Sequence, residues 1–281
     1  MDISIVVPFH NVEQYIERCV LALLSQRFPK DSFEIIMVDN NSTDGSAEIV
    51  RRYPQIKLLC ESKIGAYAAR NRGVAESRGE IIAFTDSDCS PEPDWLQKIG
   101  QALASPRVCI VQGRQCAASK SLGLSVLNDY EAEKAAYIFS ARRVETYYSH
   151  ANSMAVRRSV FDRVGPFLEM KRGADTVFMR RVIEAYSNDA VLYSPDMCVQ
   201  HLEVSSIWNM FQKMNIYGKS SRGYSRIVKC RQLNVRERLQ VLRTTIERGE
   251  YSVDKSLVLI LLLCVGVLYF EHGRRYPLTY D

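Results

Sequence analysis

Short apolar runs alternate with segments of helical periodicity along the first 112 residues. Such runs are typical of buried strands, and apolar residues at three- and four-residue spacing are typical of one buried helix face. The predicted strands cover 3–7, 35–38, 56–60, 81–85 and 108–112, and the predicted helices cover 12–25, 46–53, 66–77 and about 91–104. Strands separated by helices of this length form βαβ units, so we expect a parallel sheet covered on both faces.

The alternation breaks beyond residue 115. The pattern there predicts strands over 152–157 and 190–194 and helices over 122–140, 175–186 and 204–218. We interpret this part as a mixed extension of the same sheet rather than an independent domain.

The segment 256–270 contains fifteen residues without a charge. A membrane-spanning helix needs about 20 apolar residues, so both a buried helix and a membrane-embedded or interfacial helix fit this length. Between residues 213 and 248 lie ten lysines and arginines, opposed only by Glu237 and Glu247. Anionic lipid head groups attract such clusters, which favours an anionic membrane surface as a partner. The net charge of +5 is too small to indicate nucleic acid.

The eight cysteines form no C-x-x-C pair and no metal-ligand spacing. Met1 and Asp2 lead directly into the first predicted strand, without the pattern of a signal peptide. These two features predict reduced thiols and a cytoplasmic setting.

Polar and acidic residues gather where the predicted strands end. The clusters are "PFHN" at 8–11, "VDNNSTDGS" at 38–46, "GAYAARNRG" at 65–73 and "TDSD" at 85–88. In an open parallel sheet, ligands bind in the crevice outside the carboxyl ends of the strands. The arrangement therefore predicts a ligand site at this edge, whatever the ligand is.

Several of these residues also fit a purely structural role. Asp44 before a helix is good N-cap chemistry, whereas Asp39 at a strand end has nothing to cap. Arg70 and Arg72 fit a solvated helix face. Gly65, however, allows close backbone approach at a helix N-terminus, where an anion is favoured.

Asp86 and Asp88 are separated by one serine. A surface turn would explain them, but side chains at i and i+2 of an extended segment point the same way, so the two carboxylates would repel. A divalent cation removes that repulsion, and Mg²⁺ and Mn²⁺ commonly hold nucleotide phosphates through one or two carboxylates. The pair therefore favours a metal–diphosphate site.

Together these motifs resemble those of a known enzyme family. The stretches "SIVVPFHNVEQYIERCVLALLSQ", "FEIIMVDNNSTDGSAEIV", "GAYAARNRGVAESRGEIIAFTDSDC" and "GADTVFMRR" resemble an inverting family-2 glycosyltransferase with the GT-A fold, over roughly 2–220. The resemblance implies an α/β fold of the GT-A type, with a Rossmann-like, mostly parallel sheet flanked by helices. It also implies a domain over 1–225, with a nucleotide-binding half (1–112) and an acceptor-binding half (113–225). We expect 226–281 to be a basic helical extension.

The resemblance implies roles for individual residues. The nucleotide-sugar site would comprise Pro8, Phe9, Asn11, Asp39, Asp44, Gly65, Arg70, Asp86 and Ser87. The Asp-x-Asp motif matches Asp86 and Asp88, which would hold Mn²⁺ or Mg²⁺, with the second aspartate, Asp88, as the direct ligand. His201 would complete the metal shell, although a lone histidine also fits a packing role.

Asp175 in "GADTVFMRR" matches the aspartate that serves as general base in the family. The preceding position, glutamate in the family motif, is Ala174 here, which leaves the supporting acid missing. Taken alone, Asp175 would fit a first-turn acid that complements a helix dipole. Asn152 is a candidate for contact with donor or acceptor.

The chain lacks the Gln-x-x-Arg-Trp motif of processive synthases, since the corresponding stretch reads "FQKMNIYGKSSR". The resemblance therefore implies single addition of a sugar from a nucleotide diphosphate donor, UDP-linked by expectation, to a hydroxyl acceptor in glycan or polysaccharide biosynthesis. The basic segment and apolar tail favour a lipid-linked acceptor and a peripheral position at the cytoplasmic face of the cell membrane.

Two alternatives remain. A sugar nucleotidyltransferase would need a glycine-rich loop after the first strand, and "PFHNVEQY" has no glycine. A degenerate nucleotide-sugar-binding or scaffold protein would have lost its acids, yet Asp39, Asp86, Asp88 and Asp175 are present.

Overall fold

The computed structural model describes residues 2–119 and 121–276, and the chain forms two compact units. The first unit comprises Met1–Gln115 and Tyr148–Leu202, and the second comprises Cys116–Tyr147 and Glu203–Asp281. The expected division into functional halves at residue 112 and an extension from residue 226 stays a prediction.

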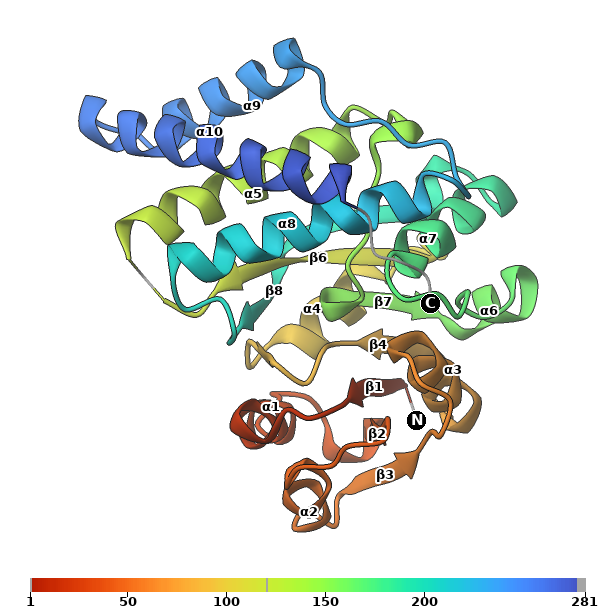
Figure 1. Cartoon of the computed structure of the whole chain (residues 1–281). Coiled ribbons are helices and arrows are strands. Elements are labelled where there is room, and N and C mark those ends of the chain that lie inside the picture. The colour runs from red at the N-terminus through yellow and green to blue at the C-terminus, as the bar shows by residue number, and fades with distance from the viewer. Residues whose placement is uncertain (1, 120, 277–281) are drawn as a thin grey trace. The chain divides into compact units, whose positions relative to one another are not determined.

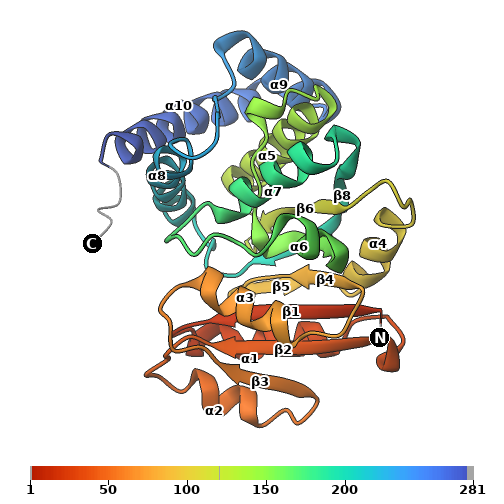
Figure 2. The ribbon, with the colours of Figure 1, turned by 90° about the vertical axis from the view of Figure 1, so that its right-hand side faces the viewer.

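An eight-stranded sheet organises the first unit, in the order β3-β2-β1-β4-β7-β6-β8-β5; β5 is labelled in Figure 2 and the other strands in Figure 1. The strands are β1 (Ile3–Phe9), β2 (Phe33–Asp39), β3 (Ile56–Cys60), β4 (Ile81–Phe84), β5 (Cys89–Pro91), β6 (Ile110–Ala117), β7 (Met154–Arg157) and β8 (Val191–His201). The run β3-β2-β1-β4 is parallel, whereas the pairs β4–β7, β6–β7 and β5–β8 are antiparallel. The predicted α/β fold with a Rossmann-like sheet is confirmed.

Helices cover both faces of the parallel part of the sheet. The helices of this unit are α1 (Glu13–Leu24), α2 (Ser46–Arg51), α3 (Ala66–Glu76), α4 (Trp95–Ala102), α6 (Arg158–Val164) and α7 (Ala174–Ala185). Figure 1 shows α1 and α2 on one face of β1–β3 and α3 on the other, and Figure 2 shows these three strands side by side. All seven residues of β1 are buried, as expected for a central strand covered on both faces.

The prediction from the sequence pattern was wrong for the segment that follows β4. We expected one helix over about 91–104, but Cys89–Pro91 form strand β5 and helix α4 begins only at Trp95. Strand β5 pairs antiparallel with β8, which is also longer than the predicted 190–194. Pairing between segments so far apart leaves no trace in local periodicity.

The second unit is helical. It contains α5 (Leu122–Ser140), α8 (Ile207–Tyr224), α9 (Val235–Arg248) and α10 (Val253–Arg275), and α8 and α10 lie side by side (Figure 1, Figure 2). Asn234 and Glu237 form a reciprocal capping box that starts α9. By length and composition, α10 is the one helix of the described residues that could cross a membrane.

Two glycines allow α8 and α10 to approach closely. A Cβ atom on Gly218 would lie 2.0 Å from the backbone oxygen of Phe270, and one on Gly273 would lie 2.0 Å from that of Asn215. Neither helix backbone can retreat without separating the pair, so Gly218→Ala is expected to lower the free energy of unfolding by about 1–3 kcal/mol.

Gly100 in α4 provides the matched control for this substitution. A Cβ there meets nothing within 4 Å, so Gly100→Ala is expected to raise stability by about 0.5–1 kcal/mol through helix propensity. Denaturant unfolding of both variants tests the packing. Equal stability of Gly218→Ala and the wild type would contradict it.

Candidate active site

The loops after β1 and β2 hold each other through polar side chains. Asp39, at the end of β2, accepts a hydrogen bond from the Ser42 backbone at 2.9 Å. Asn11, whose φ of 50° lies in the left-handed region, accepts one from the Thr43 backbone at 2.8 Å. Both side chains therefore shape the loop over 39–43, and both remain candidates for nucleotide contact.

Asp44 is tied into the same loop pair, but it is not the N-cap of α2, because that position is Gly45. Its carboxylate accepts from the backbone of Glu13 at 3.0 Å and from the backbone and hydroxyl of Ser46 at 3.0 and 2.5 Å. Slight burial opposes ionisation, but these hydrogen bonds hold the pKa of Asp44 below its usual value. Pro8 and Phe9 are buried. Their predicted nucleotide contacts stay predictions.

The N-terminus of α3 presents open space at the same sheet edge. Gly65 has a φ of 135°, and its N–H donates to Asn40 Oδ1 at 2.7 Å. A Cβ atom at Gly65 would meet nothing within 4 Å. The backbone here can therefore be approached closely by a ligand, as a diphosphate at a helix N-terminus requires.

Arg70, on α3, is directed at the first aspartate of the Asp-x-Asp motif. Its side chain is 5% exposed, forms an ion pair with Asp86 and lies over the Tyr67 ring at 5.1 Å. Its Nε is buried without a hydrogen-bond partner among the described residues. Asp86 thus has its counter-charge within the protein.

The Asp-x-Asp segment is a turn, so the expectation of an extended segment was wrong. The Cys89 N–H donates to the Asp86 carbonyl at 3.0 Å and closes the turn. As a result the two carboxylates meet different partners, Arg70 for Asp86 and His201 for Asp88. Repulsion between the two carboxylates is therefore no argument for a metal at this site. The argument for a metal has to come from the donor atoms around Asp88.

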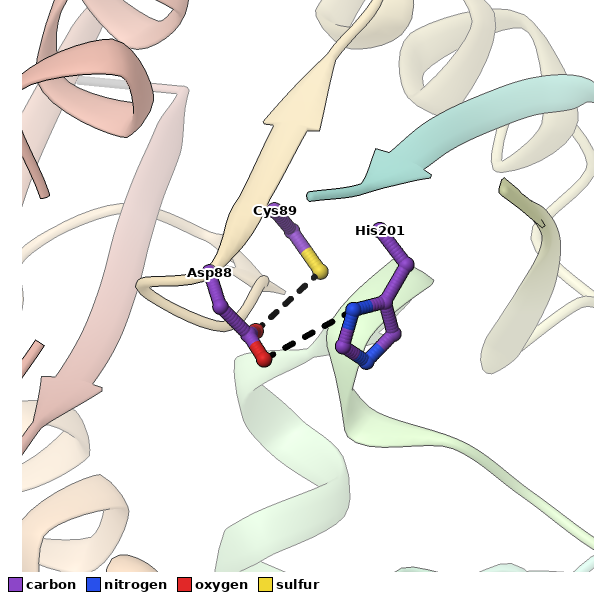
Figure 3. Close-up of side chains that lie close together, drawn as sticks. All are labelled: Asp88, Cys89 and His201. Carbon is purple, nitrogen blue, oxygen red and sulfur yellow. Dashed lines mark hydrogen bonds and ion pairs between the residues drawn. The ribbon is translucent and has the colours of Figure 1, made fainter. Parts of the chain in front are cut away.

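Asp88 and His201 come together because β5 pairs with β8. Cys89 is opposite His201 in the register, and the Leu202 N–H donates to the Asp88 carbonyl at 2.8 Å. Asp88 Oδ2 lies 3.6 Å from His201 Nδ1 (Figure 3). With Cys89 Sγ, these atoms form a group whose members lie within 4.8 Å of one another.

The chemistry of this group fits a divalent cation. Carboxylate oxygen suits Mg²⁺ and Mn²⁺, and imidazole nitrogen suits the transition metals. His201 is buried and Asp88 is partly exposed, so the group opens towards solvent on the Asp88 side. Among the described residues, Asp86 belongs to no such group, so the candidate metal ligands are Asp88 and His201 rather than Asp86.

Asp175 lies in the first turn of α7. Its carboxylate accepts from the Ala151 N–H at 3.1 Å and from the Thr176 N–H at 2.9 Å, and its own N–H donates to the Tyr67 hydroxyl at 3.4 Å. The residue is half-buried and its carboxyl group is surrounded by protein. Burial raises the pKa of Asp175, against the lowering effects of His150 and Arg70.

Asn152 lies in the short 3-10 turn before β7. It is buried, and its side-chain N–H₂ donates to Gln115 Oε1 at 2.6 Å. Its Oδ1 is buried without a hydrogen-bond partner among the described residues. A contact of Asn152 with donor or acceptor stays a prediction.

Two residues of this site were missed in the sequence. Tyr67 links α3 to Asp175. In the sequence, the motif around Tyr67 indicated only that this residue lies on a helix. We excluded Cys89 as a ligand because the cysteines do not have the sequence spacing of known metal sites. Such spacing detects ligands that are close in sequence, whereas His201 is far from Cys89 in the chain. The position of Cys89 directly after Asp88 was the available signal.

Comparison with known proteins agrees with the geometry. The family model described as glycosyl transferase family 2 matches residues 4–165, more than half of the chain. The glycosyltransferase AglE of Haloferax volcanii is 31% identical over 194 residues, which are 65% of this chain and 62% of AglE. The chain thus spans less than two thirds of that relative.

Solved structures share the fold at low sequence identity. A mannosyltransferase from Pyrobaculum calidifontis, in complex with GDP-mannose and Mn²⁺, superposes with a TM-score of 0.68 at 18% identity, covering 98% of this chain and 87% of that one. Residues 1–349 of TarS from S. aureus, in complex with UDP-GlcNAc, give a TM-score of 0.56 at 19% identity, covering 96% and 82%. Sequence match and fold together show that the chain belongs to glycosyl transferase family 2.

Proposed function

We propose that this chain is a metal-dependent, inverting glycosyltransferase that transfers a single sugar from a UDP-sugar to a hydroxyl acceptor. One observation carries the proposal. The first unit brings together Asp88 and His201, which are candidate metal ligands, and it also holds a partly desolvated carboxyl group at Asp175. Arg70 pairs with Asp86, two residues before Asp88, and its charge also acts on Asp175.

Asp88 and His201 would hold the cation, Mn²⁺ or Mg²⁺. When bound, the ion supplies Lewis-acid stabilisation of the negative charge on the departing nucleoside diphosphate. Arg70 contributes a fixed positive charge next to Asp86. The open backbone at Gly65 and the side chains of Asn11 and Asp39 would bind the rest of the nucleotide.

Asp175 would act as the general base. Its carboxylate takes the proton of the acceptor hydroxyl while that oxygen bonds to the anomeric carbon and the bond from this carbon to the diphosphate breaks. One displacement of this kind inverts the anomeric centre. The backbone donors of Ala151 and Thr176 fix the orientation of the carboxylate. They replace, in part, the support that an acid at Ala174 would give.

The pH profile tests this assignment. Because burial raises the pKa of Asp175, the acid limb of kcat/KM is expected above the ordinary value of 3.8. His150 lowers that pKa, so His150→Asn is expected to move the limb to higher pH. His272→Asn, an exposed histidine on α10, should leave the limb unchanged. A shift to lower pH in His150→Asn would contradict the assignment.

The donor and the metal are tested with a panel of UDP- and GDP-sugars and the full chain. The right donor should raise the melting temperature, because it binds only the folded state. Release of nucleoside diphosphate should occur with Mn²⁺ and stop with EDTA. Binding and release confined to GDP-sugars would overturn the UDP assignment, and release that persists in EDTA would overturn the metal dependence.

The proposal extends to a lipid-linked acceptor at an anionic membrane surface, through α10. Exposed apolar side chains follow one face of this helix at three-, four- and seven-residue spacing: Leu257, Ile260, Leu261, Val267 and Leu268. Leu259, Gly266 and Gly273 are buried on the other face. The helix would lie in the interface with its exposed face among the acyl chains.

The basic segment before α10 contributes less charge than its composition suggests. Acids of the same unit form ion pairs with Lys213, Arg231, Arg243 and Arg248. We therefore assign most of the membrane affinity to the apolar face, since a buried leucine contributes about 1.5–3 kcal/mol and a basic residue near the surface about 1 kcal/mol.

Vesicle co-sedimentation tests this ranking. Leu268→Asp is expected to weaken binding to vesicles of phosphatidylcholine and phosphatidylserine by about tenfold or more. Leu21→Asp is the control, because Leu21 on α1 is also an exposed leucine, 54% against 70% for Leu268. Unchanged vesicle binding of Leu268→Asp, or a wild type that does not sediment with vesicles, would contradict the membrane role.

A further inference from the structure

The candidate metal group contains a sulfur atom. The Cys89 thiol donates to Asp88 Oδ1 at 3.6 Å, while Asp88 Oδ2 faces His201 Nδ1 at 3.6 Å (Figure 3). The Asp88 carboxylate therefore lies between a thiol and an imidazole. Cys89 is 0% exposed and His201 is 5% exposed. A nitrogen donor from β8, a sulfur donor from β5 and an oxygen donor from the turn before β5 thus converge.

The spacing of these donors is compatible with one ion. Zinc-type ligands lie at about 2.0–2.3 Å from the metal, so two donors of one ion lie at most about 4.6 Å apart. One donor atom from each residue lies within 4.8 Å of the other two, which is close to this limit. Cys89 Sγ and His201 Nδ1 each lie 3.6 Å from an oxygen of the Asp88 carboxylate.

The backbone holds the three donors in place. Cys89 and His201 face each other in the β5–β8 register, and the turn before Cys89 is closed onto Asp86. Donors on paired strands need little ordering when an ion binds.

A buried cysteine is often only a small apolar residue. Cys19 illustrates that role: it is 0% exposed on α1, and its thiol donates to the Asp86 carbonyl at 3.6 Å. Among the described residues it belongs to no group of metal-binding donors. Cys89 differs because its sulfur contacts a carboxylate that is itself a metal-ligand candidate.

We propose that Cys89 is a sulfur ligand of the cation held by Asp88 and His201, and that it biases this site towards thiophilic divalent ions. The inference rests on the proposed metal site. On binding, a metal–sulfur bond forms and the thiol proton is released to solvent. Thiolate favours softer ions such as Zn²⁺, Co²⁺ and Cd²⁺, whereas Mg²⁺ prefers oxygen and gains little from sulfur.

Cobalt spectroscopy tests the sulfur directly. The protein is the full chain with the exposed thiols Cys60 and Cys264 changed to serine, so that they do not bind metal. Saturation with Co²⁺ is expected to give a sulfur-to-cobalt charge-transfer band in the near ultraviolet. Cys89→Ser should abolish the band, and Cys19→Ser should keep it. Serine retains a hydroxyl donor for Asp88, so the comparison isolates the sulfur.

Calorimetry gives a second reading. Cys89→Ser is expected to weaken Cd²⁺ binding by about tenfold or more while leaving Mg²⁺ binding nearly unchanged. Co²⁺ binding to the wild type without the charge-transfer band, or equal bands in Cys89→Ser, would overturn the inference and leave the proposed metal dependence intact. A protein that binds no divalent ion at all would overturn both. The wild-type spectrum decides even where a variant does not fold.

Discussion

Asp175→Asn is expected to lower kcat for sugar transfer by about 10²–10⁴-fold, the contribution typical of a positioned general base. Asparagine keeps the shape of the side chain, and one of its atoms can still accept from the Ala151 or Thr176 N–H. What it loses is the ability to take the acceptor proton. Donor affinity should therefore change little, and the loss should fall on kcat.

Asp162→Asn is the control for this substitution, because Asp162 is an exposed aspartate on α6 in the same unit. It should keep wild-type activity. Transfer assays at saturating donor, combined with donor binding by calorimetry, separate the two effects. An Asp175→Asn variant with wild-type kcat would remove Asp175 from the mechanism and leave the base unassigned.

Asp88→Asn is expected to have an effect of similar size, a loss of about 10²–10³-fold in kcat, as for other groups placed opposite developing charge. The variant removes the carboxylate that faces His201 but keeps the backbone carbonyl that accepts from Leu202. The turn should therefore survive. Its Mn²⁺ affinity should fall together with its turnover, whereas its melting temperature without metal should stay close to that of the wild type.

Asp196→Asn serves as the control, since Asp196 is an exposed aspartate on β8, the strand that also carries His201. Mn²⁺ titration by calorimetry and nucleotide release at saturating Mn²⁺ are the two measurements. If Asp88→Asn binds Mn²⁺ and releases nucleotide like the Asp196 variant, the metal is not held at Asp88.

Local patterns were enough to predict most helices and strands. The uninterrupted apolar run at β1 and the three- and four-residue spacing in α1 both reflect burial within one element. The strand β5 was not accessible in this way. It forms because β8 provides a pairing partner. Its three residues, Cys89, Ser90 and Pro91, are too few and too mixed to show a strand pattern of their own.

The site shows the same division. Asp88 and Asp175 could be found because their motifs are contiguous in the sequence. The partners that decide their chemistry could not be found in this way. The Arg70–Asp86 ion pair depends on how α3 packs. The contact between Cys89 and Asp88 depends on a turn that we had expected to be an extended segment. The repulsion expected between Asp86 and Asp88 disappeared for that reason.

The measurement that tests the central claim most directly is the anomeric configuration of the first product. Proton NMR can follow the reaction of an α-linked UDP-sugar with Mn²⁺ and a simple hydroxyl acceptor, and it reports the anomeric configuration of the product as it forms. A single displacement assisted by Asp175 predicts a β-linked product. An α-linked product would contradict the single displacement and, with it, the role given to Asp175.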